Sequence, residues 1–148
     1  MKLIKRRINA AFMLLVLLGL MIISVAATNT GIMPRYNNTA GTSTNFAIST
    51  TGKATVTATY DGVRGTTTGA TVTSYIEKRT LGIFWTKVDI GQTNNEWVDT
   101  STDYADAFVH EFYLSDTGTY RVTVTYEISG TGGATDVIDF EKTVTYSN

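Results

Sequence analysis

The sequence predicts an all-β domain, an antiparallel sandwich of about seven strands, and three observations support this. Runs of alternating apolar and polar residues recur along the chain, and no window after residue 27 has a sustained 3.6-residue periodicity. Threonine supplies 28 of the 121 residues after position 27, and its β-branched side chain suits a half-exposed strand. Turn-forming clusters rich in glycine, asparagine and aspartate separate the runs.

Residues 1–27 have the three parts of a secretory signal peptide. Four basic residues lie within the first seven positions, an apolar run covers 10–23, and Val25 and Ala27 supply the small residues of a cleavage site. Cleavage predicts a secreted, extracellular protein. The alternative is a retained membrane anchor, since the apolar stretch 10–27 reaches the lower limit of a bilayer-spanning length.

The charge of the chain limits which partners it can bind, and its cysteine content shows whether disulfides can stabilise it. The full chain has a net charge of −1, and residues 28–148 hold eight basic and 13 acidic residues, a net charge of −5. This acidic balance argues against a nucleic-acid partner, which requires a basic face. No cysteine is present, so we expect a disulfide-free domain that depends on its apolar core.

The first predicted strands follow an irregular leader at 28–43, and the sandwich domain is expected to cover 44–148. A short strand at 45–49 would turn Phe46 and Ile48 inward. The run "KATVTATY", 53–60, alternates alanine, valine and tyrosine with threonine. This alternation predicts a strand with one buried face.

The central strands are predicted at 69–79, at 85–90 and at 106–114. The second of these is either continued by or paired with a segment near Trp97. The last two strands are expected at 119–129 and 137–146, where a glycine-rich loop would join them as a hairpin.

A motif before the sixth run refines the fold. "LSDTGTYRVTV" holds Asp116, Gly118 and Tyr120 in the D-x-G-x-Y spacing, with Val122 two residues later. The motif resembles the start of strand F in immunoglobulin-like domains, and the surrounding run is similar to fibronectin type III and polycystic-kidney-disease-type domains. The resemblance implies an immunoglobulin-like antiparallel β-sandwich in which the Tyr120 hydroxyl bonds back to the chain. Val122 replaces the usual cysteine and is expected to pack against Val56 or Ala58.

Four blocks extend the resemblance over nearly the whole chain after residue 27. "TGIMPRYNNT", "EKRTLGIFWTKVDIG", "NEWVDTST" and "SGTGGA" look like those of short secreted proteins of unknown function from Gram-positive bacteria. The resemblance implies export from a bacterial cell and a β-sandwich, and it implies no activity.

Catalytic and metal-binding patterns are weak. His110 is the only histidine, and its place in an apolar stripe with Phe108 and Phe112 favours a structural, hydrogen-bonded role over that of a catalytic base or metal ligand. Three carboxylates, from Asp99, Asp103 and Asp106, lie close together in sequence. They could bind a hard cation such as calcium, or they could belong to a solvated connection, which is the reading we favour. No enzyme and no cofactor are predicted.

The segment "TLGIFWTKV" places apolar and aromatic residues where a hairpin tip is normally polar. The candidate ligand-binding residues are Leu81, Ile83, Phe84 and Trp85 in this segment, together with Trp97 a little further along the chain. If these side chains are exposed, they could stack on a sugar ring or anchor a protein partner. The alternative is that they cap an open end of the sandwich.

These observations favour a small exported, non-enzymatic binding module whose ligand is a protein or a glycan. Contact with a membrane is expected only through an uncleaved signal peptide. A structural or assembly subunit, docking through a sheet edge or the leader, is the second hypothesis. A secreted hydrolase is the third, and it would require His110 in a pocket beside an acid.

Overall fold

Eight β-strands and one short 3₁₀ turn make up residues 35–147, the part of the chain that this computed structural model describes. The elements are β1 Thr39–Ile48, β2 Lys53–Gly62, β3 Thr67–Thr80, β4 Phe84–Lys87, η1 Thr93–Asn95, β5 Trp97–Ser101, β6 Ala105–Tyr113, β7 Gly118–Gly130 and β8 Asp136–Tyr146. The predicted signal peptide at 1–27 and leader positions 28–34 lie outside the described residues. Within 35–147, no helix has the length and apolar character needed to cross a bilayer.

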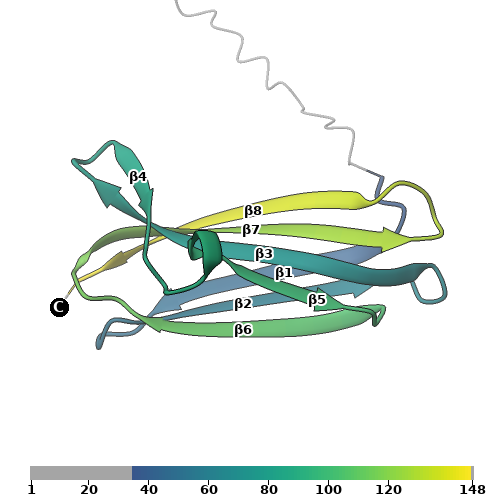
Figure 1. The fold of residues 1–148 in the computed structure, drawn as a ribbon, viewed down its shortest axis with the longest axis horizontal. Coiled ribbons are helices and arrows are strands. Elements are labelled where there is room, and N and C mark those ends of the chain that lie inside the picture. The colour runs from purple at the N-terminus through teal and green to yellow at the C-terminus, as the bar shows by residue number, and fades with distance from the viewer. Residues whose placement is uncertain (1–34, 148) are drawn as a thin grey trace, which may run out of the picture. The chain divides into compact units, whose positions relative to one another are not determined.

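The strands form two antiparallel sheets. One sheet has the order β1-β2-β6, and the other has the order β4-β3-β7-β8, with β5 also paired to β3. The strands β5 and β4 share one edge of β3, at Ala70–Ser74 and Glu77–Thr80 respectively, while β7 pairs along the opposite edge. Figure 1 shows the long strands running along the longest dimension of the domain. The predicted all-β, two-sheet class is therefore confirmed, with one strand more than expected.

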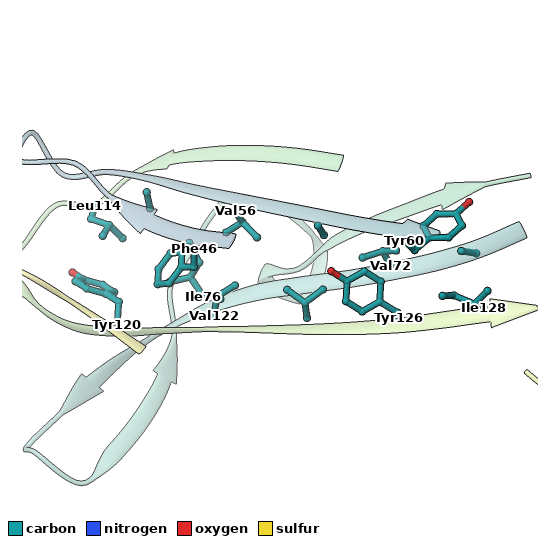
Figure 2. Close-up of a cluster of buried hydrophobic side chains, with 14 residues drawn as sticks. Phe46, Val56, Tyr60, Val72, Ile76, Leu114, Tyr120, Val122, Tyr126 and Ile128 are labelled. Carbon is teal, nitrogen blue, oxygen red and sulfur yellow. The ribbon is translucent and has the colours of Figure 1, made fainter. Parts of the chain in front are cut away.

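The space between the sheets is filled by the apolar side of each alternating run, because successive side chains of a strand point to opposite faces. Figure 2 shows these side chains meeting from both sheets. The largest fully buried ones are Tyr120, Tyr126, Phe46, Ile76, Ile128, Val56, Val72, Val122 and Val124. Val122 belongs to the same buried cluster as Val56 and Ala58.

One end of the core is secured by Tyr120. Its side chain is almost fully buried, and its hydroxyl donates a 2.6 Å hydrogen bond to the carbonyl oxygen of Asp116. The backward hydrogen bond predicted from the D-x-G-x-Y spacing is thus present. It fixes the turn between β6 and β7 and holds the ring under that turn.

The opposite end is secured by a buried carboxylate. Asp136, at the start of β8, accepts hydrogen bonds from the backbone N–H groups of Asn37 and Asn38, at 2.9 and 2.7 Å, and from the hydroxyl of Thr39 at 2.9 Å. The fully buried Asn38 side chain donates to the carbonyl of Ala134 and accepts from Gly132 N–H. These contacts tie the beginning of β1 to the β7–β8 hairpin.

Two predicted elements need correction. The first strand begins at Thr39 rather than at Asn45, because β1 pairs with β2 along its whole length and is anchored by Asp136. The strand predicted at 85–90 ends at Lys87, and Trp97 begins a separate strand. Between them, Asn94 and Asn95 adopt positive φ angles in the 3₁₀ turn, a conformation that asparagine tolerates well.

Candidate functional site

The β3–β4 hairpin carries the two most exposed large apolar side chains of the described residues, Leu81 and Ile83, and a third exposed one, Phe84. Leu81 is 89% exposed, Ile83 68% and Phe84 58%. The hairpin projects from one end of the domain (Figure 1). Because neighbouring apolar side chains at a projecting tip contribute nothing to the core, the tip, residues 81–84, is the main candidate contact surface.

The turn at the tip breaks a local sequence preference. Leu81 and Gly82 have φ angles of 51° and 73°, and Ile83 N–H donates to the carbonyl of Thr80 at 3.2 Å. Two successive positive φ angles are typical of a type I′ turn, whose first position favours asparagine, aspartate or glycine. Leucine at that position is both conformationally unfavourable and exposed to water.

Trp85 lies on the other face of the hairpin from Phe84, since consecutive strand residues alternate. Its ring centre is 4.6 Å from the Arg121 guanidinium carbon. Arg121 in turn donates to the Glu77 carboxylate at 2.9 Å from Nε and 2.6 Å from Nη2. This cation–π stack is backed by an ion pair in which two guanidinium N–H groups of Arg121 donate to one Glu77 oxygen, and it makes Trp85 the attachment of the hairpin base to β7.

Trp97 does not belong to the tip. It pairs with Ser74 near the middle of β3, and its indole stacks on the His110 ring with centres 4.8 Å apart and planes 3° apart. His110 Nε2 is 2.7 Å from an Asp99 carboxylate oxygen. This cluster links the edge strands β5 and β6. The His110 ring is hydrogen-bonded and partly buried, as expected from sequence.

A pocket of about 420 Å³ lies beside the hairpin. Its apolar wall includes Val88, Phe112, Leu114 and Tyr120, and polar groups from Lys78 and Thr86 border it. Its volume falls in the range of small-ligand and side-chain pockets. The lining comes from two segments about thirty residues apart, 78–89 and 112–120, and no sequence motif indicated that these segments meet.

One pair of opposite charges at the pocket is internally compensated. Lys78 Nζ donates to the Asp116 carboxylate at 3.1 Å and lies 5.7 Å from the Tyr120 ring centre. The hydrogen bond that Lys78 donates to Asp116 raises the pKa of Lys78, and the same contact lowers the pKa of Asp116. Both groups therefore stay ionised near neutral pH, and the pocket presents no net charge from this pair.

The acidic cluster predicted as a possible cation site is dispersed. Asp99 is engaged by His110, and the Asp106 carboxylate accepts from the N–H of Ala107. Among residues 35–147, no group of three or more His, Cys, Asp or Glu side chains is arranged to hold a metal ion.

Comparison with protein-family models, with curated proteins and with solved structures found no match to this chain. The functional argument therefore depends on the geometry of the hairpin and its pocket.

Proposed function

We propose that the chain is a secreted, non-enzymatic, immunoglobulin-like module that binds an extracellular partner through the β3–β4 hairpin tip. The strand orders β1-β2-β6 and β4-β3-β7-β8 and the Tyr120 hydrogen bond support the immunoglobulin-like assignment. The export signal read from residues 1–27 supports the compartment.

The observation that carries the proposal is Leu81. A turn position that favours asparagine or glycine holds a leucine that is 89% exposed. A leucine side chain is unfavourable at this backbone conformation, and here it buries almost no surface. It therefore does not stabilise the fold. Local rules of this kind are typically broken where a residue serves binding.

The tip favours a protein partner over a glycan. Its two most exposed residues, Leu81 and Ile83, are aliphatic, whereas sugar rings are usually bound on flat aromatic faces. Trp85, the aromatic ring best suited to stacking, is already occupied by Arg121. The adjoining pocket offers a second apolar surface for a partner side chain.

The test compares capture by wild-type protein with capture by a tip variant, Leu81→Asn/Phe84→Ser, using extracellular proteins of the producing cell and a glycan array. A matched control is Val109→Ser/Val137→Ser, because these valines are 58% and 56% exposed on strands away from the tip. Trp85 is left intact so that the hairpin stays attached.

We expect the control variant to capture what the wild type captures and the tip variant to lose it by tenfold or more, as for the loss of a binding hot spot, about 1.4 kcal/mol or above. Equal capture by the tip variant would contradict the proposal. Capture of glycans alone would replace the protein partner by a sugar.

A further inference from the structure

The hairpin tip and the pocket lie side by side at the same end of the domain and have opposite shapes. The tip is a protrusion with three exposed apolar side chains. The pocket is a cavity of about 420 Å³ with an apolar wall. We infer that two copies of the chain pair by reciprocal insertion, the tip of each copy packing into the pocket of the other. This inference rests on the proposed use of the tip as a contact surface.

The register of the hairpin directs the tip toward such a contact. Phe84 lies opposite Thr80 and Thr86 lies opposite Lys78, so these side chains share one face of the hairpin. Thr80, Thr86 and Lys78 line the pocket. Phe84 therefore projects on the pocket side, just beyond the pocket mouth. A two-fold axis between tip and pocket exchanges the two features, which is the requirement for a self-complementary interface.

Reciprocity favours a second copy over a one-sided contact. A single tip offers only three large apolar side chains, and a lone contact of that size does little to offset the loss of translational and rotational freedom on association. A two-fold contact buries two tips, one from each copy, in one association event. It also fills both pockets, so each copy contributes a protrusion and a cavity.

The charges that border the contact do not oppose it. In the pocket lining, Lys78 pairs with Asp116, and Lys87 pairs with Glu96. Each of these two pairs is neutral within one copy, so neither sets like charges against each other when two identical surfaces approach.

The pairing would be end to end. The hairpin adjoins the first residues of β7, where Lys78 pairs with Tyr120, whereas Asn38 lies beside Asp136 at the other end of β7. Figure 1 shows the β4 hairpin and the β7–β8 loop at opposite ends. Two copies joined through their tips would carry their Asn38 positions at the far ends of the dimer.

The test uses single cysteines, which report one site each because the chain has none of its own. The protein is expressed from its full sequence with Ile83→Cys at the tip, or with Ser115→Cys at the exposed pocket rim, and one variant carries a mass tag. The two are mixed and treated with a short bismaleimide. Val109→Cys, on the other sheet and equally accessible, replaces the tip variant in the control.

We expect the tip–rim product to exceed both the tip–tip and the control–rim products by roughly tenfold, because sites held in one complex have a raised effective concentration. Sedimentation of the wild type should show a monomer–dimer equilibrium that Leu81→Asn weakens by about tenfold or more. Preferred tip–tip products, or a monomer at every concentration up to about 1 mM, which corresponds to a negligible affinity, would overturn the inference.

The two proposals fail separately. A monomeric wild type that still captures an extracellular protein through the tip would overturn the dimer and leave the binding module intact. A monomer that instead binds phosphatidylcholine–phosphatidylglycerol vesicles through the tip would overturn the dimer and identify a lipid surface as the partner. A dimer with no capture of other molecules would leave self-association as the tip's only role.

Discussion

Two polar side chains fix the ends of the apolar core. The hydroxyl of Tyr120 donates to the carbonyl of Asp116 at one end, and the carboxylate of Asp136 accepts three hydrogen bonds at the other. Each is buried and each is hydrogen-bonded. Buried polar groups stabilise a fold when they are satisfied and destabilise it when a partner is removed, so both residues should be sensitive to substitution.

Replacement of Tyr120 separates its two contributions. Tyr120→Phe removes only the hydrogen bond and should lower the free energy of unfolding by about 1 kcal/mol. Tyr120→Ala also empties the site of the ring and should lower it by about 3–5 kcal/mol. Urea unfolding followed by fluorescence measures both. Tyr113→Ala, at an exposed position, serves as the control and should change stability little. Equal values for the three variants would contradict this role.

Asp136 should make stability fall in acid. Burial acts to raise its pKa, but hydrogen bonds from the N–H groups of Asn37 and Asn38 and from Thr39 outweigh burial, and the net pKa is lowered. A lowered folded-state pKa means that the stabilisation is present above the unfolded value, about 3.9, and is lost as pH falls through the folded value. The loss should therefore occur below about pH 4.

The measurement is the urea midpoint from pH 7 to pH 2 for wild type and Asp136→Asn. At pH 7 the variant should be less stable by about 1–3 kcal/mol, because an amide cannot accept on both sides. The urea midpoint of the variant should change less with pH below pH 4 than that of the wild type. The exposed Asp61→Asn should follow the wild type, and a variant profile as steep as that of wild type would assign the acid sensitivity to other groups.

At the scale of elements, the hairpin joins a well-anchored base to an unfavourable turn. Trp85 stacks on Arg121 at the base, whereas Leu81 occupies a left-handed backbone position at the tip. The base therefore holds the hairpin in place although the turn sequence does not favour it. This separation allows the tip to be altered without loss of the fold.

Leu81→Asn should leave the free energy of unfolding unchanged or raise it by up to about 1 kcal/mol, since asparagine suits a left-handed position better than leucine does. Thermal and urea unfolding measure the change. Gly82→Ala is the matched opposite, because alanine at a φ of 73° is strained and should destabilise the hairpin by about 1 kcal/mol. A marked loss of stability in Leu81→Asn would show that the leucine packs against the domain.

The sequence predicted some elements better than others for physical reasons. Strands β2, β7 and β8 were located closely because one face of each is apolar and the other polar. The first half of β1 was missed because Thr39–Asn45 has no apolar alternation. That half is held by pairing with β2 and by Asp136, about a hundred residues away, and local pattern carries no such information.

At the scale of the whole molecule, the sheets join segments that are far apart in sequence. The β1 strand lies in contact with β8, and Tyr126 donates from β7 to the carbonyl of Ser43 on β1 at 2.9 Å. The pocket likewise combines segments 78–89 and 112–120. For this reason the tip could be predicted from one stretch of sequence, whereas the pocket required the assembled fold.

Long-range pairing should also set the rate of folding. Chains dominated by non-local strand contacts refold in about milliseconds to seconds. Stopped-flow dilution from urea, followed by the fluorescence of Trp85 and Trp97, should give a main phase in that range. The rate should be the same with and without reductant, because no cysteine is present. A main phase faster than about 100 μs would contradict the expected dependence on topology.

The position of Asn38 opposite the hairpin has a mechanical consequence. If the segment before Asn37 were held at a surface and the tip were bound, tension would run along the length of the domain. The antiparallel hydrogen bonds between β1 and β2 lie across that direction, so all of them would resist sliding together rather than opening one at a time. The Asp136 contacts with Asn37 and Asn38 would bear the load first, and a single-molecule pulling trace of Asp136→Asn should show a weaker first rupture.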